Sequence, residues 1–103
     1  MDLTQPKKPR VQPDSFACLD DKEENLLVTV GLPGVKKEAI DLRMRDDVIY
    51  VRAERDDIEF LGHIHSAEKI DPRKAKASFE NGLLDVKVAL KEKKTSAVKI
   101  KIE

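Results

Sequence analysis

Residues Ala77 to Leu90 read ASFENGLLDVKVAL, and this stretch decides the fold. Apolar and polar side chains alternate along it, and Asn81-Gly82 interrupts the alternation once. A period of two is typical of a strand with one buried face, and Asn-Gly readily adopts the positive φ angles of a two-residue hairpin turn. The stretch therefore predicts a β-hairpin. Its second strand is expected to bury Leu84, Val86, Val88 and Leu90.

Most of the remaining chain keeps the same period of two. Pro33-Gly34 ends one such run, because proline lacks the N–H that a strand ladder needs and glycine permits a turn. Residues 36–40 predict a short turn or a single helical turn. We expect the other strands at residues 15–20, 25–33, 40–45, 48–55, 58–66, 74–79 and 98–102. This pattern predicts an all-β fold, an immunoglobulin-like antiparallel β-sandwich of seven or eight strands.

The length of 103 residues fits one domain. Residues 1–13 contain three prolines and several basic residues without periodicity, which predicts a flexible N-terminal arm. A solvated terminus is the simpler interpretation of this arm, and contact with an acidic partner is the alternative. We expect the sandwich to span residues 14–90 and a polar C-terminal tether to span residues 91–103.

The composition excludes several classes of function. Twenty acidic and twenty basic residues cancel, so the net charge does not point to nucleic acid or to an anionic membrane as a partner. No run approaches the roughly 18 apolar residues of a membrane-spanning helix, and no apolar segment near Met1 indicates a secretory signal. The high content of charged residues, 39%, with few amides, leans toward a heat-adapted protein. We expect a cytoplasmic location.

The residues that could carry chemistry are few. Cys18 is the single cysteine and sits within a strand pattern, which predicts a buried thiol and not a nucleophile. His63 and His65 share one strand face; this spacing can bind a metal, although two ligands leave a zinc site incomplete, and two solvent-facing side chains are the alternative. Adjacent aspartates such as Asp46-Asp47 are better suited to turns than to acid–base catalysis. We expect no enzyme activity, no cofactor and no metal.

The opening stretch also resembles a known family. Ala77, Asn81, Gly82 and Leu84 spell A-x-x-x-N-G-x-L, which closely resembles the signature of the α-crystallin domain of small heat-shock proteins. Three further segments are similar to motifs of that family: VGLPGVKKEAIDLRM at 30–44, VIYVRAER at 48–55, and the Ile-Lys-Ile of residues 100–102, which looks like its C-terminal I-x-I. The resemblance covers about residues 14 to 102. On this interpretation Ala77 lets the two sheets approach closely.

The resemblance implies an ATP-independent chaperone, or holdase, that binds partly unfolded proteins and prevents their aggregation. Ile100 and Ile102 would be plugs that enter a groove between the strand around Ile40 to Met44 and the strand Leu84 to Leu90. The alternative is that residues 98–102 complete their own sandwich as an edge strand. The self-association residues implied in this way are Ile40, Leu42, Met44, Leu84, Val86, Val88, Ile100 and Ile102.

Two departures from the family pattern affect assembly. Many members have a long loop with a strand that swaps into a partner's sheet, whereas residues 55–57 here run almost directly into the next strand. Gly62 also stands where the family usually has arginine. We therefore predict a monomer or small dimer, and the short arm favours an alternative function as an adaptor or co-chaperone-like interaction domain. The expected dimer edge contains Ile58, Phe60, His63 and His65.

Overall fold

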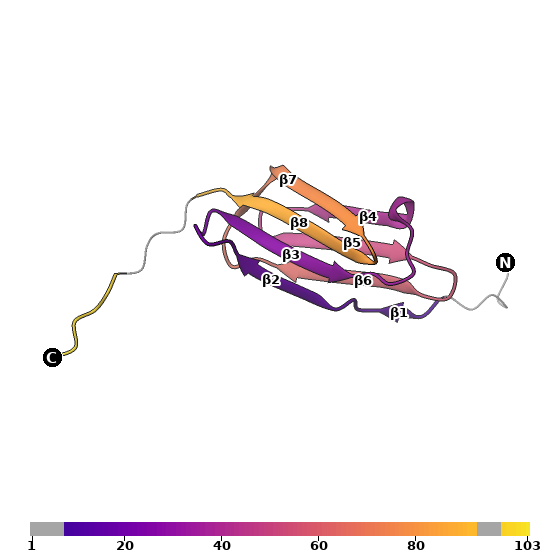
Figure 1. Cartoon of the computed structure of the whole chain (residues 1–103), viewed down its shortest axis with the longest axis horizontal. Helices are drawn as coiled ribbons and strands as arrows, with labels where there is room; N and C mark the ends of the chain where they lie inside the picture. Colours follow the sequence, from indigo (N-terminus) through magenta and orange to yellow (C-terminus); the bar gives the residue numbers. More distant parts are fainter. Residues whose placement is uncertain (1–7, 93–97) are drawn as a thin grey trace.

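The computed structural model describes residues 8–92 and 98–103, and its strands form two sheets packed face to face (Figure 1). One sheet has the strand order β1-β6-β5-β4 and the other β2-β3-β8-β7. The prediction of an all-β sandwich is confirmed. The strands are β1 (Arg10–Val11), β2 (Ser15–Leu19), β3 (Asn25–Gly31), β4 (Ile40–Met44), β5 (Val48–Glu54), β6 (Glu59–His65), β7 (Ile70–Glu80) and β8 (Leu83–Leu90), with one 3₁₀ turn, η1 (Lys37–Ala39).

The core lies between the two sheets and consists almost entirely of branched aliphatic side chains. On β3 and β8 every second residue is buried, as the alternation predicts. β3 and β8 are interior strands of their sheet and β5 is interior to the other, so their inward side chains are covered on all sides. The largest fully buried side chains are Leu32, Ile49, Ile70, Val28, Val30, Val51 and Val88.

The Asn81-Gly82 turn joins β7 to β8 as the sequence predicts. Asn81 has φ of 52° and Gly82 has φ of 79°, so both central residues adopt the left-handed conformation that a tight two-residue hairpin needs. Glu80 and Leu83 are cross-strand partners on either side of the turn. The carbonyl oxygen of Gly82 accepts a 2.8 Å hydrogen bond from the amide of Leu32, which fixes the turn against the end of β3.

The C-terminal segment differs from the expected strand. Residues 98–103 have no strand structure, and the side chains of Val98, Ile100 and Ile102 are exposed. The predicted strand at 98–102 is therefore wrong, and so is the alternative that it completes its own sandwich. Alternating isoleucine and lysine favour an extended conformation, but a strand also needs a neighbouring backbone to accept its hydrogen bonds. Residues 93–97 of the predicted tether lie outside the described residues.

The N-terminal segment also differs from expectation. Arg10 and Val11 form β1, which pairs in parallel with Glu59 and Phe60 of β6. Pro13 is buried. The expected flexible arm is thus wrong for residues 8–13, while residues 1–7 lie outside the described residues. The composition of this segment does not show that a sheet edge distant in sequence lies close enough to pair with it.

Candidate interaction surfaces

The first candidate surface is the pair of edge strands β4 and β7, which lie along the same long side of the sandwich in Figure 1. Ile40, Leu42 and Met44 of β4 are half-buried and pack against the core. Ala75 and Phe79 of β7 are half-buried against the same core. Because neither strand has an outer neighbour in its sheet among the described residues, these apolar side chains remain partly open to solvent. We call this surface the β4–β7 edge.

One of the two strands predicted to form the groove is different in the structure. Leu84, Val86 and Val88 are only 3%, 2% and 0% exposed, because β8 lies inside its sheet. They are core residues, and the open face belongs to β7 instead. Ala77 pairs with Val86 and so points to the same face, yet it is exposed. The interpretation of Ala77 as a spacer between closely packed sheets is therefore wrong, since it lies on the edge strand.

Ile100 and Ile102, the residues expected to enter the groove, lie in the described C-terminal segment. Ile100 is 76% exposed and Ile102 is 93% exposed. Lys99 and Lys101 alternate with them and are exposed as well. The structure thus shows two unburied isoleucines at a spacing that puts both on one side of an extended chain. It does not bring them to the β4–β7 edge.

The second candidate surface is the free side of β6, which was predicted as a dimer edge. Its residues divide into two groups: Phe60 is buried and Ile58 half-buried, whereas His63 and His65 are exposed. Phe60 belongs to the core and is not a surface contact, whereas Ile58 packs on the core and stays partly exposed. The ring of His63 contacts that of Tyr50 edge-on, with centroids 5.0 Å apart. β1 covers the start of this edge, at Glu59 and Phe60.

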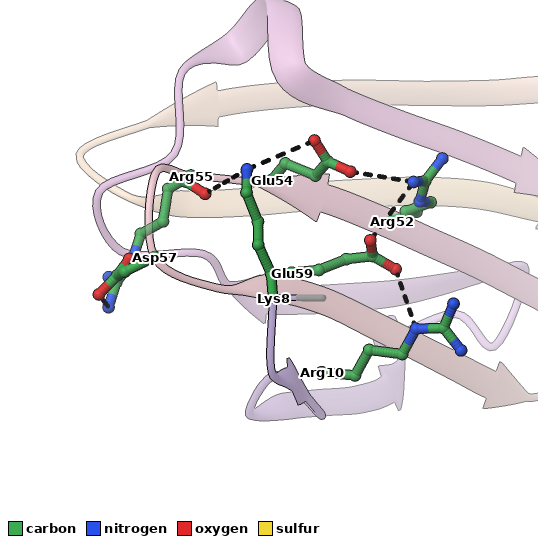
Figure 2. Close-up of polar contacts among 7 residues, drawn as sticks. All are labelled: Lys8, Arg10, Arg52, Glu54, Arg55, Asp57 and Glu59. Carbon is green, nitrogen blue, oxygen red and sulfur yellow. Dashed lines mark hydrogen bonds and ion pairs between the residues drawn. The ribbon is translucent and has the colours of Figure 1, made fainter. Parts of the chain in front are cut away.

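A charged cluster holds the N-terminal residues against β5 and β6 (Figure 2). Lys8 Nζ donates a 3.0 Å hydrogen bond to the carbonyl oxygen of Arg55 and lies 3.7 Å from Glu54 Oε2. Arg10 Nε lies 3.4 Å from Glu59 Oε1. Arg52 Nη2 donates to Glu54 Oε1 at 2.9 Å and to Glu59 Oε2 at 3.3 Å. The hydrogen bond from Arg52, followed by the nearby positive charges, lowers the pKa of Glu59.

Pro13 packs against Gly62 next to this cluster. A Cβ added at Gly62 would lie 3.1 Å from Cγ and 3.3 Å from Cδ of Pro13. The absence of a side chain at this position therefore lets Pro13 pack closely against β6. Sequence reasoning missed this contact, although an isolated glycine inside a strand pattern is a known sign of close approach by another segment.

A depression at the same end of the sandwich carries charges of both signs. It is lined by three basic and three acidic residues, so it offers no net field for an anion or for a cation. The Arg55 side chain crosses it, pairing with Asp57 at 2.7 Å and donating to the carbonyl oxygen of Pro33 at 2.7 Å. Its charged lining is Lys8, Lys36, Arg55, Glu54, Asp56 and Asp57.

The candidate chemical residues are dispersed over the surface. Cys18 is exposed, so the prediction of a buried thiol is wrong. It pairs with Leu27 on the outer face of its sheet, and the strand period alone did not identify which face is outside. Among residues 8–92 and 98–103, no group of three or more His, Cys, Asp or Glu side chains could hold a metal ion. That part of the chain also contains no helix with the length and apolarity needed to cross a membrane.

Comparison with known proteins gives one family. A model of the Hsp20/alpha crystallin family matches residues 19–103. No curated protein sequence matches the chain.

Solved structures give the same fold. Heat shock protein 16.0 from Schizosaccharomyces pombe is 26% identical, with a TM-score of 0.72 over 90% of this chain and 99% of that one. A mutant of hsp14.1 from Sulfolobus is 20% identical, with a TM-score of 0.69 over 90% of this chain and 80% of that one. A C-terminally truncated form of the small heat shock protein AgsA from Salmonella typhimurium is 19% identical, with a TM-score of 0.63 over 89% and 100% of the two chains.

Proposed function

Because the chain belongs to the Hsp20/alpha crystallin family, whose members are non-enzymatic chaperones, we propose that it is an ATP-independent holdase. In this role it binds partly unfolded proteins through exposed apolar surface and keeps them from aggregating. Such clients present apolar side chains and unpaired strands, which an open sheet edge can bind. The partner is thus a non-native protein and not a nucleic acid or a membrane.

The β4–β7 edge is the observation that supports this function. Ile40, Leu42 and Met44 pack against the core from one edge strand and remain half-exposed. They extend the core to the surface without a cover. A client segment that places alternate apolar residues against them would bury this surface further, and each fully buried large apolar side chain is worth about 1.5–3 kcal/mol.

The C-terminal isoleucines are proposed to bind the same edge reversibly. Residues 91–99 separate Ile100 from the end of β8, and a fully extended chain of that length spans roughly 30 Å. This length allows Ile100 and Ile102 to dock on their own domain or on a neighbouring copy. Burial of the two side chains gives a contact of a few kcal/mol, which clients can displace. The tail then acts as a competitor for the client surface.

A light-scattering assay with a heat-labile client tests the proposal. We expect the parent chain to suppress aggregation at near-stoichiometric amounts. Leu42→Ser should weaken this suppression, because it removes an apolar side chain from the β4–β7 edge. Arg43→Ser is the matched control, since Arg43 is the next residue of β4 and its side chain is exposed on the opposite face. Equal suppression by both variants would exclude this edge as the client surface.

One observation favours a second function as an adaptor or co-chaperone-like interaction domain. β5 ends at Glu54 and β6 begins at Glu59, so the connection between them carries no additional strand that could exchange with a partner. We propose a monomer or small dimer at micromolar concentration. In the same assay an adaptor would leave client aggregation unchanged at stoichiometric amounts, which distinguishes the two functions.

A further inference from the structure

Two lysines lie opposite each other on the outer face of the sheet β2-β3-β8-β7, where β7 and β8 run side by side (Figure 1). Lys76 of β7 is the direct cross-strand partner of Lys87 of β8. The next pair, Ala75 opposite Val88, packs in or against the core, so both lysines point outward, and both are exposed. Like charges placed directly opposite each other destabilise a sheet. Folding gains nothing from this pair, which points to a role other than stability.

A β-bulge beside the two lysines adds further positive charge. The register of β7 on β8 shifts between Ile70 and Ala75, so residues 71–74 stand opposite Ala89 alone. Bulges redirect side chains and are frequent next to functional sites. A depression of about 450 Å³ lies beside this bulge. Its described lining contains four basic residues, two alanines and one asparagine, with no acidic residue: Arg73, Lys74, Lys76, Lys87, Ala75, Ala89 and Asn25.

The lysines of this depression are not neutralised by ion pairs. Among residues 8–92 and 98–103, none of Lys74, Lys76 and Lys87 pairs with a carboxylate. Three carboxylates in the surroundings are bound elsewhere: Asp71 to Arg73, Asp85 to Thr29 and Asp20 to Asn25. Although the chain has no net charge, this face therefore has a local positive field, unlike the mixed depression that Arg55 crosses.

We propose that this depression binds a linear chain of phosphoryl groups, as in free inorganic oligophosphate, and that Lys74, Lys76 and Lys87 contact it. Lys74 and Lys76 are separated by a rise of about 6–7 Å along β7, and Lys87 lies across from Lys76. A chain of several phosphates matches this spread better than one phosphate does. Charge-assisted bonds to phosphate are among the stronger hydrogen bonds, and a bound anion removes the repulsion between Lys76 and Lys87. Client binding at the β4–β7 edge requires no anion, so the inference goes beyond the proposed function.

Titration calorimetry of the full chain with tripolyphosphate tests this site. Lys76→Gln with Lys87→Gln should weaken binding by at least about tenfold, because it removes two charged donors and keeps the length of the side chains. Lys76→Arg with Lys87→Arg should retain binding. The matched control is Lys36→Gln with Lys37→Gln, which makes the same change in net charge at exposed positions outside the depression. We expect the control to bind as the parent does, and we expect binding to weaken as salt is added.

The glutamine variant at positions 76 and 87 also separates lost binding from lost folding. Without ligand, its thermal midpoint should not fall below that of the parent, because the substitution removes a like-charge pair. No tripolyphosphate binding by the parent, equal affinity of the parent and this variant, or an equal loss in the control would each overturn the site.

Two further ligands test the chemistry of the phosphate chain. Inorganic phosphate should bind more weakly than tripolyphosphate, and equal affinity would contradict a site for several phosphates. ATP should bind no more tightly than tripolyphosphate, because the described lining of the depression has no aromatic side chain on which a base could stack. Tighter binding of ATP would indicate nucleotide recognition and would exclude the free phosphate chain as the ligand.

Discussion

Arg55 Nη1 donates a 2.7 Å hydrogen bond to the carbonyl oxygen of Pro33, which links the loop after β5 to the turn after β3. β5 and β3 belong to different sheets, so one side chain joins the two layers at this end. The same guanidinium pairs with Asp57 and lies 5.7 Å from the centroid of the Phe60 ring. Gly34, with φ of 79°, leaves room for it, because a Cβ there would lie 3.2 Å from Arg55 Cδ.

We predict that Arg55→Ala lowers the free energy of unfolding by about 1–2 kcal/mol, because it leaves the Pro33 carbonyl without its charged donor. Arg55→Lys should recover less than half of this loss. The planar guanidinium of arginine contacts Pro33 and Asp57 with different nitrogen atoms, which the single ammonium of lysine cannot do. Unfolding in urea measures the free energy of unfolding of both variants. Arg43→Ala is the control, because its ion pair with Asp41 is exposed and local; we expect a loss below about 0.5 kcal/mol. Equal losses at positions 43 and 55 would contradict the cross-sheet role.

We predict that Gly82→Val destabilises the domain severely and Gly82→Ala less, by about 1–2 kcal/mol. A steric clash is not the reason for this destabilisation, because the nearest atom to an added Cβ is Cα of Pro33 at 3.5 Å. The cost comes from φ of 79°, which a β-branched residue tolerates worst. Gly31→Ala is the control, since Gly31 has no positive φ and its Cβ would lie 3.8 Å from the nearest atom. A thermal midpoint of Gly82→Val within a degree or two of the parent would disprove the turn.

We predict that Asp20 contributes to the pH dependence of stability. Its carboxylate accepts hydrogen bonds from the Asn25 side chain at 2.8 Å and from the amides of Glu24 and Asn25 at 2.9 and 3.1 Å. The Asn25 bond is the largest of the influences that lower the pKa of Asp20 below 3.8. Because the folded pKa is the lower one, this contribution is complete above about pH 4 and is lost as the pH falls through the folded value.

The thermal midpoint at pH 6 and pH 3 measures this effect. Asp20→Ala should lower the midpoint at pH 6 and leave a smaller further decrease on acidification than the parent shows. Asp21→Ala is the matched control, because Asp21 is exposed in the same turn and accepts none of these three bonds. If acidification lowers the midpoints of the parent and of Asp20→Ala by the same amount, the carboxylate is not a source of the pH dependence.

We predict that Ile100→Ser with Ile102→Ser leaves the sandwich folded with a cooperative unfolding transition, because both side chains are exposed and form no strand. The same variant should lower self-association on a sizing column and increase the binding of an apolar dye, since the β4–β7 edge loses its competitor. Lys99→Ser with Lys101→Ser is the control for polarity and length. Loss of cooperative unfolding in the isoleucine variant would show that the tail is part of the core.

The sequence predicted those parts of the fold in which local pattern and tertiary structure agree. The Asn81-Gly82 turn and the alternation of β3 and β8 fall in this class, because turn chemistry and strand period are local properties. The pairing of β1 with β6 was missed, since a two-residue strand has no period to detect. Burial of Leu84, Val86 and Val88 was predicted, but their assignment to a groove ignored strand order, which depends on contacts distant in sequence. The exposure of Cys18 likewise depends on the strand order and on which face of the sheet is covered.

The two-residue turn between β7 and β8 also has a kinetic consequence. A hairpin closed by so short a loop loses little entropy and forms on a microsecond timescale, whereas pairing β3 with β8 requires closure of the long chain between Gly31 and Leu83. We therefore expect the β7–β8 hairpin to be structured in the transition state for folding. The Leu32 bond to Gly82 should form later. Substitutions in the turn would then slow folding, and those at Leu32 would mainly speed unfolding, which stopped-flow measurements with denaturant can separate.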